Sequence, residues 1–117
     1  MKLRTDAYGN RQYGYESNDG YFILSREDGP AVEYLNGEFE YWLDGQLHRE
    51  DGPAVFKHDF IMWFRNGVRH REDGPAIEVN SGKYGYGFYK EWWFQGEKVS
   101  VLDNEEFLRL VKLRIFW

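Results

Sequence analysis

The sequence predicts an all-β domain, in which stacked β-hairpin repeats form a single twisted antiparallel sheet with a short capping α-helix at the C-terminus. The hexapeptide Arg-Glu-Asp-Gly-Pro-Ala occurs three times, at residues 26–31, 49–54 and 71–76. Between the copies, apolar residues alternate with period two and glycine-containing turn dipeptides separate the runs, a pattern typical of hairpins. Such units stack, because each buries its apolar side only against its neighbours.

Residues 1–25 are expected to form a degenerate leading hairpin of a single repeat domain, 1–117. Glycine-containing turns at 8–10 and 18–20 precede a strand pattern over 21–24. A terminal unit of this kind caps one end of a repeat array. Its outer strand could also pair with a second copy, so a homo-oligomer through a sheet edge is one expectation.

The first full unit, residues 26–48, has clear turn signals. We expect a strand over 31–35, a tight turn at Asn36-Gly37, a returning strand over 38–43 and a second turn at Asp44-Gly45. Asn-Gly and Asp-Gly favour the positive φ angles of two-residue hairpin turns. The Gly-Pro pair at 29–30 closes the unit, and Asp28 is expected to bind its own backbone in an Asx-turn.

The second and third units, residues 49–70 and 71–99, repeat this plan. Aligning the units on their turn glycines, Gly45, Gly67 and Gly96, superposes a pair of aromatic residues that precedes each turn. Adjacent strand residues point to opposite faces, so we expect two structural ladders of rings. The first ladder contains Tyr41, Trp63 and Trp92, and the second contains Trp42, Phe64 and Trp93.

The third unit carries an inserted segment, 81–88, in which glycines alternate with aromatic residues. Exposed tyrosines supply a large contact area at low entropic cost, which is typical of partner-binding surfaces. Two alternatives are that these rings lengthen the ladders or that they stack on a sugar. The candidate partner-binding residues are Tyr84, Tyr86, Phe88 and Tyr89.

The apolar period changes near the C-terminus. Asp103 and Glu106 have the spacing of a capping-box variant, and apolar residues follow at helical spacing as far as Ile115. This pattern predicts a short amphipathic helix within 103–115, from about 104 to 114. The helix would cover the last open edge or face of the sheet, which otherwise invites aggregation.

Composition limits the possible partners and location. The formal net charge of −5 argues against a groove for long nucleic acid and favours a basic protein partner. Cysteine is absent, so disulfides and thiolate metal sites are excluded. The chain has neither the apolar run of a signal peptide nor the roughly 18 apolar residues of a membrane span, so we expect a cytoplasmic protein without membrane contact.

His-Arg-Glu-Asp recurs at 48–51 and 70–73. Stacked repeats spread these groups too far apart for one ion, so no metal or cofactor is predicted. The main expectation is inter-unit pairing, with Arg49 on a carboxylate of the adjacent unit and each histidine on a backbone carbonyl. The alternative is capture of a nucleotide or sugar by arginines and stacked rings. The alternative ligand-binding residues are Arg26, Arg49, Arg71, His48, His70, Trp42 and Trp63.

Catalysis is not expected. The sequence lacks a nucleophile elbow, a glycine-rich phosphate loop and a His-Glu-x-x-His motif. Adjacent carboxylates such as Glu50 and Asp51 lie on one turn, and they do not converge on a bond as an acid and a base must. The sequence therefore predicts a protein that binds without catalysing a reaction.

The segments Trp42 to His48 and Phe64 to His70 share an aromatic-x-x-Gly-x-x-His pattern. This pattern resembles MORN repeats, and also the MORN-like repeats of YwqK-type antitoxins and of small phage and bacterial proteins with His-Arg-Glu-Asp-Gly-Pro-Ala units. The resemblance covers roughly residues 20–98 and implies stacked hairpins that bind proteins. It departs after the histidine, where MORN units continue with Gly-x-Gly. A small bacterial or phage protein that inhibits or scaffolds another protein, in an antitoxin-like or anti-defence-like role, is the resulting expectation.

Overall fold

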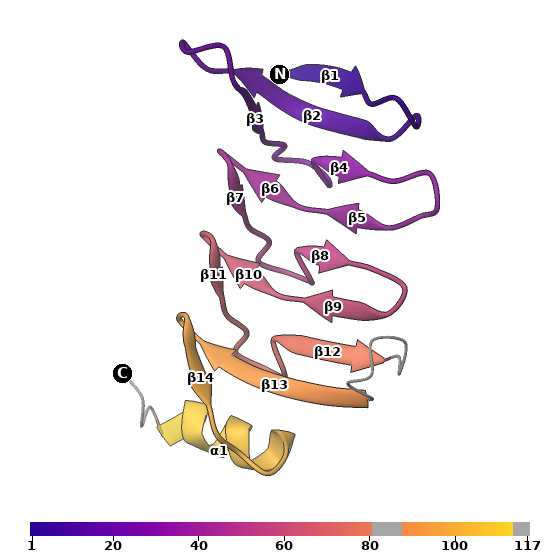
Figure 1. Ribbon diagram of the computed structural model, residues 1–117. Coiled ribbons are helices and arrows are strands. Elements are labelled where there is room, and N and C mark those ends of the chain that lie inside the picture. Colours follow the sequence, from indigo (N-terminus) through magenta and orange to yellow (C-terminus); the bar gives the residue numbers. More distant parts are fainter. Residues whose placement is uncertain (81–87, 114–117) are drawn as a thin grey trace.

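In a computed structural model, which describes residues 1–80 and 88–113, the chain forms an elongated stack of hairpins closed at one end by a helix (Figure 1). Its principal extents are 44 × 33 × 22 Å. The radius of gyration is 16.1 Å, against about 13 Å for a compact domain of this length. The predicted all-β fold with a C-terminal helix is confirmed, and its open shape leaves much of the sheet uncovered.

Most strands belong to one antiparallel sheet, in the order β1-β2-β4-β5-β8-β9-β12-β13-β14, with β3 paired to β2. Two additional hairpins, β6-β7 and β10-β11, stand beside it. The elements are β1 Lys2–Thr5, β2 Arg11–Glu16, β3 Phe22–Leu24, β4 Val32–Glu33, β5 Phe39–Glu40, β6 Trp42–Leu43, β7 Gln46–Leu47, β8 Val55–Phe56, β9 Phe60–Met62, β10 Phe64–Arg65, β11 Val68–Arg69, β12 Ile77–Asn80, β13 Phe88–Phe94, β14 Glu97–Val99 and α1 Asn104–Leu113.

The strand expected over 38–43 is divided into β5 and β6 at Tyr41. The Tyr41 backbone N–H donates to the carbonyl of Ala54 in the next unit at 2.6 Å, and the same residue's carbonyl accepts from His48 at 3.1 Å. Trp63 repeats the first bond with Ala76 at 2.7 Å. One residue therefore joins two rows of hairpins, which Figure 1 shows side by side along the stack.

The two predicted turns of the first unit have different outcomes. Asp44 and Gly45 have φ angles of 50° and 80°, which confirms a tight turn with two left-handed residues. The turn at Asn36-Gly37 is wider than predicted: Tyr34 N–H bonds to Glu38 O at 3.0 Å, and Gly37 N–H bonds back to Tyr34 O at 3.1 Å. Strand β4 therefore ends at Glu33, and Leu35 lies in the turn.

Alternation along the strands gives the main sheet two faces. One face, here called the valine face, carries buried Val32, Val55 and Ile77. The opposite face, here called the arginine face, carries the cross-strand pair Phe39 and Phe56, and the repeat arginines stack on its rings. The alanine that ends each hexapeptide is completely buried, so a larger side chain does not fit there. These alanines are Ala31, Ala54 and Ala76.

Helix α1 covers the last hairpin of the stack. Phe107 on this helix is fully buried. The predicted capping-box variant is present: Asp103 Oδ1 accepts from Glu106 N–H at 2.9 Å, and Glu106 Oε2 accepts from Leu102 N–H at 3.1 Å. Two backbone donors at the start of the helix are thus satisfied, which fixes where the helix begins.

Candidate functional site

Each arginine that begins a hexapeptide donates hydrogen bonds within the turn of its own motif. Arg49 Nε donates to Asp51 at 3.1 Å and Nη1 donates to the carbonyl of Pro53 at 3.1 Å. Its guanidinium carbon also lies 4.1 Å from the centre of the Tyr41 ring in the preceding unit. The corresponding contacts of Arg26 are with Asp28, Pro30 and Tyr13, and those of Arg71 are with Asp73, Pro75 and Trp63.

The hexapeptide glycine provides the other wall of this arginine site. A Cβ atom added to Gly52 would lie 2.7 Å from Arg49 Cζ, and one added to Gly74 would lie 2.8 Å from Arg71 Cζ. The guanidinium is therefore held between an aromatic ring and a glycine backbone. Arg, Asp, Gly and Pro of the repeated motif form one interlocking turn, and the ring that they engage belongs to the neighbouring unit.

Two expectations about these motifs are wrong. Arg49 pairs with Asp51 of its own motif rather than with a carboxylate of the adjacent unit. Asp28, which was expected to bind its own backbone, instead accepts from Arg26 Nε at 3.1 Å, and Asp51 accepts from Arg49 Nε in the same way. The physical reason is that Nε of arginine, held flat on glycine, reaches the carboxylate two residues ahead and forms a charge-assisted bond.

The repeat histidines accept hydrogen bonds rather than donate them to carbonyls. His70 Nδ1 accepts from the backbone N–H of Gln95 at 2.9 Å, and His48 Nδ1 accepts from Asn66 N–H at 2.9 Å. Ser25 binds Asp44 N–H at the equivalent place. These donors lie at the first left-handed position of the next unit's turn, so each histidine fixes the hairpin that follows.

The ladder with Trp42, Phe64 and Trp93 has its own polar partners. Trp42 Nε1 donates to Glu40 at 2.8 Å, and Trp93 Nε1 donates to Glu91 at 3.0 Å. The Trp93 indole lowers the pKa of Glu91 by donating to its charged form. The middle unit has Met62 in the corresponding place beside Phe64, which has no N–H. A glutamate acceptor therefore accompanies tryptophan at this position, and an apolar methionine accompanies phenylalanine.

An apolar patch lies at the centre of the arginine face. Phe39 and Phe56 are stacked, with ring centroids 5.0 Å apart and an interplanar angle of 12°. Ile61 is the cross-strand partner of Phe56, and Tyr41 lies edge-on to Phe39 at 5.6 Å. Together with Trp63, these residues are partly exposed. We call Phe39, Tyr41, Phe56, Ile61 and Trp63 the aromatic patch.

A cavity of about 230 Å³ lies beside the patch, between the turns of the second and third units. It is lined by Trp63, Arg65, His70 and Glu72, together with the repeat arginines Arg49 and Arg71. His70 is 4% exposed. Burial lowers the pKa of His70, and the nearby Arg65 lowers it further. This cavity brings together Arg49, Arg71, His70 and Trp63 of the alternative ligand-binding set, and we call it the inter-repeat cavity.

The remaining members of that set lie elsewhere. Arg26 stacks on Tyr13 near the N-terminal end, and it lines a different cavity together with His48. The Trp42 indole is bound to Glu40 on the valine face. The seven alternative ligand-binding residues are therefore distributed over successive units rather than gathered in one site.

The predicted partner-binding segment is only partly described. Tyr84 and Tyr86 lie outside the described residues. Phe88 is 78% exposed and Tyr89 is 38% exposed. Phe88 pairs with Asn80 and Tyr89 with Val79, so the two neighbouring rings point to opposite faces of β13. One flat partner therefore contacts only one of them.

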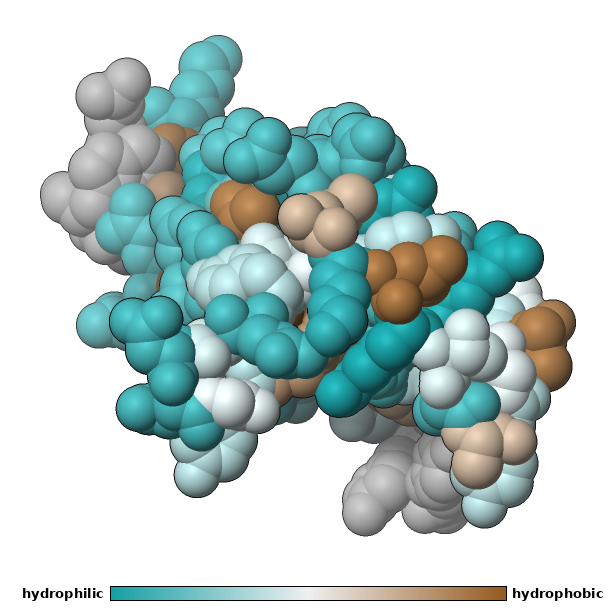
Figure 2. All heavy atoms as spheres, turned by 90° about the horizontal axis from the view of Figure 1, so that it is seen from above, coloured by the Kyte–Doolittle hydropathy of each residue, from teal (hydrophilic) through white to brown (hydrophobic). Residues whose placement is uncertain are grey.

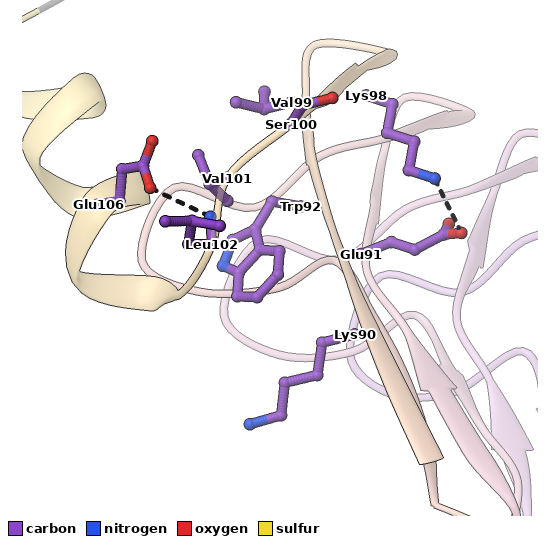
Figure 3. A pocket seen from close by; sticks show the side chains of 9 residues that line it. All are labelled: Lys90, Glu91, Trp92, Lys98, Val99, Ser100, Val101, Leu102 and Glu106. Carbon is purple, nitrogen blue, oxygen red and sulfur yellow. Dashed lines mark hydrogen bonds and ion pairs between the residues drawn. The ribbon is translucent and has the colours of Figure 1, made fainter. Parts of the chain in front are cut away.

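A second cavity, of about 490 Å³, lies where helix α1 meets the last hairpin (Figure 3). Figure 3 shows the bond between Glu106 and Leu102 on one side and the ion pair of Lys98 with Glu91, at 3.4 Å, on the other. Trp92 lies between them, and its Nε1 donates to Asn104 at 3.0 Å. Of these contacts, the bond from Trp92 to Asn104 joins the sheet to the helix, whereas the other two lie within the hairpin and within the helix cap.

Residues 1–80 and 88–113 contain no group of three or more histidines, cysteines and carboxylates placed to hold a metal ion. Within the same residues, no helix has the length and apolar character that crossing a membrane requires.

The fold and these surfaces define a protein of stacked β-hairpin repeats that is covered by a helix at one end. Comparisons with models of protein families, with curated proteins and with solved structures gave no match to this chain.

Sequence reasoning missed Phe39, Phe56, Ile61 and Arg65. Period-two alternation does place Phe39 on the face of Tyr41, so one signal was present. Arg65 had a different signal: the residue two positions before the turn glycine is Leu43 in the first unit and Phe94 in the third. A cation at a position that is otherwise apolar marks the second unit as different from its neighbours.

Proposed function

We propose that this protein is a non-catalytic binding module that holds a basic protein partner on its arginine face. The aromatic patch is the observation that carries this proposal. Its rings are already ordered by stacking, so binding immobilises few additional side chains. Aromatic anchors at the centre of a surface supply most of the binding energy in protein interfaces.

The charges around the patch favour a basic partner. Asp51 and Asp73 are strongly exposed but already pair with Arg49 and Arg71, whereas Glu50, whose side chain is 75% exposed, adds a negative charge that the motif arginine does not compensate. Exposed carboxylates beside an apolar centre attract lysine and arginine side chains and speed encounter. This arrangement agrees with the net charge of −5.

The sequence resemblance indicates which biological role such a binding surface would have. A MORN-like repeat protein of bacterial or phage origin, which inhibits or scaffolds one host protein, would use an extended sheet face in this way. The open shape supports it, since the accessible surface of 7697 Å² exceeds the roughly 6,700 Å² of a compact monomer of this mass.

Capture of a nucleotide or sugar along the arginine ladder has less support. Arg26, Arg49 and Arg71 each use Nε and Nη1 within their own motifs, and each guanidinium covers a ring face that a base would need. An external anion would have to displace the motif aspartate. The inter-repeat cavity differs in this respect and is treated below.

The third unit shows which residues can replace the centre of the aromatic patch in a test of the arginine face. The cross-strand pair Glu78 and Lys90 occupies the register of Phe56 and Ile61. The double variant Phe56→Glu, Ile61→Lys therefore copies a pair that this sheet already accommodates. We expect it to fold and to lose the partner, because it replaces the centre of the patch with charges.

The measurement is affinity capture from bacterial lysate with quantification of the retained protein. The matched control is Leu102→Ser, which changes a 92% exposed residue outside the patch. We expect the wild-type chain and the control to retain one basic protein in stoichiometric amount. Equal retention by the double variant, shown to be folded by circular dichroism, would refute the proposed surface.

A further inference from the structure

The inter-repeat cavity contains buried donors that have no protein acceptor. Trp63 Nε1, Arg65 Nε and His70 Nε2 are buried and lack a hydrogen-bond partner among the described residues. His70 Nδ1 accepts from Gln95, so in the neutral ring the proton is on Nε2, which makes this atom a donor. Buried polar groups are nearly always satisfied, and a group that is not calls for an explanation.

The three side chains line the same cavity, and two of them approach one carboxylate. The Glu72 Oε1 atom is 3.5 Å from His70 Nε2 and 3.4 Å from Arg65 Nη1. Both distances are longer than those of well-formed charge-assisted bonds, which are about 2.7–2.9 Å. The side chain of Glu72 is 58% exposed, so its carboxylate reaches the donors from the rim of the cavity without filling the space between them.

We propose that the inter-repeat cavity is an oxyanion-binding site, in which Trp63 Nε1, His70 Nε2 and the Arg65 guanidinium donate to a small phosphate or carboxylate group. This inference concerns a different ligand from the protein partner of the arginine face and does not depend on that partner.

The site is particular to the second unit. The equivalent cavity of the first unit has Tyr41 in place of Trp63 and Leu43 in place of Arg65. The indole and guanidinium N–H groups are therefore absent there, although the histidine, arginine, glutamate and aspartate of the motif are kept. Both units keep the contacts that hold the fold together, but only the second unit has these donors. The donors are therefore not required by the fold, as expected for a ligand site.

The charges that face the cavity permit a weakly bound anion. Arg49 and Arg71 are paired with Asp51 and Asp73 of their own motifs. The remaining groups are the Arg65 cation and the carboxylates of Glu72 and Glu50, and Glu50 lies 4.0 Å from His48 Nε2. A ligand therefore competes mainly with Glu72, which is free to turn into solvent. The volume of about 230 Å³ admits one small anion.

The test is an NMR titration of the 117-residue chain with inorganic phosphate at constant ionic strength. The indole N–H of Trp63 is expected to shift downfield as it gains an acceptor. The indoles of Trp42, Trp92 and Trp93 already donate to Glu40, Asn104 and Glu91, so their signals are internal controls and should stay in place. Chloride at the same ionic strength should not reproduce the shift.

Two variants sharpen the titration. Arg65→Leu copies Leu43 of the first unit, so it should fold normally and weaken phosphate binding by about tenfold or more, since a charged donor is removed. Glu72→Gln removes the competing charge and should strengthen phosphate binding by about fivefold. A parallel titration with acetate determines whether the site prefers phosphate or carboxylate, and binding of either supports it.

The proposal is overturned if neither anion moves the Trp63 signal, or if all indole signals move together. It is also overturned if a folded Arg65→Leu variant binds phosphate as tightly as the wild-type chain. Loss of the protein partner in the capture experiment leaves these outcomes unchanged, because the patch substitutions keep Arg65 and His70.

Discussion

At the scale of single residues, the main role of the hexapeptide is to hold the guanidinium group of its arginine in one position. Arg49 is bonded at its edge to Asp51 and Pro53, and it lies flat between the Tyr41 ring and Gly52. The ring belongs to one unit and the glycine to the next. A short motif thus completes a turn and joins two repeats with the same side chain.

Substitution of the motif glycine should therefore loosen the joint between units. We expect Gly52→Ala to lower the free energy of unfolding by about 1–3 kcal/mol, because the new methyl group displaces Arg49 from its ring. Gly29→Ala is the matched control, since its Cβ would lie 3.2 Å from Arg26 Cζ rather than 2.7 Å from Arg49 Cζ. Urea unfolding of both variants measures the difference, and a larger loss for Gly29→Ala would contradict this account.

His70 should make stability depend on pH. Its folded-state pKa is lowered from 6.5 by burial and by Arg65, so the unfolded chain binds the proton more readily. The stabilisation is therefore complete above pH 6.5 and is lost as the pH falls through the folded-state pKa. Protonation also removes the acceptor for Gln95 N–H.

The measurement is the melting temperature between about pH 7.5 and 5, a range that spans the ordinary histidine pKa. In His70→Asn, the amide oxygen takes over the acceptor role without titrating, so the melting temperature should vary less over this range. An unchanged slope would show that other groups cause the pH dependence.

At the scale of elements, the units are short strands held by their connections. Strands β4, β5, β8 and β10 contain two residues each, and an isolated hairpin of such strands is marginal in water. Inter-unit bonds compensate, from Tyr41 to Ala54 and from Trp63 to Ala76. Helix α1 covers the last unit and contributes a buried aromatic side chain of its own.

That side chain, Phe107, is fully buried and is the largest such side chain among the described residues. We expect Phe107→Ala to destabilise the chain by about 3–5 kcal/mol, the usual loss for removing a core ring. Because repeat stability is passed between neighbours, hydrogen exchange should increase first in β13 and β14 and least in β2. A uniform increase along the stack would contradict this nearest-neighbour account.

Local signals predicted much of the fold, and interactions between units limited the prediction of the site. The Asp44-Gly45 turn and the helix cap depend on residues close in sequence, and both were predictable. The bend at Tyr41 arises from a hydrogen bond to the next unit, so the residues of one hairpin do not reveal it. Identical repeats also leave open whether Arg49 binds its own aspartate or a neighbouring one.

At the scale of the whole molecule, the chain is a stack of interchangeable units. The contact of Arg49 with Tyr41 has the same form as that of Arg71 with Trp63. His48 and His70 likewise bind the turn that follows. The sequence on both sides of each junction is therefore equivalent, although the surfaces of the units differ.

Deletion of residues 49–70 should accordingly leave a folded, shorter protein. It joins His48 to Arg71, which would then stack on Tyr41, while His48 takes over the bond to Gln95. We expect cooperative melting at a lower temperature, since one set of inter-unit contacts is lost. Circular dichroism and analytical ultracentrifugation check this. A molten or aggregated product would mean that the units are not equivalent.

The two ends of the stack differ. Helix α1 covers one end, whereas β1 at the other end leaves a strand edge without a neighbour in the sheet. Seen from that end, the surface is mostly hydrophilic, with scattered apolar residues (Figure 2). Lys2 and Arg4 lie on one face of β1, where Lys2 pairs with Glu16 and Arg4 donates to Gln12. Antiparallel pairing of two copies there would crowd these charged side chains together. Charged side chains on an edge strand oppose edge-to-edge pairing, so we expect this terminus to resist growth into fibres.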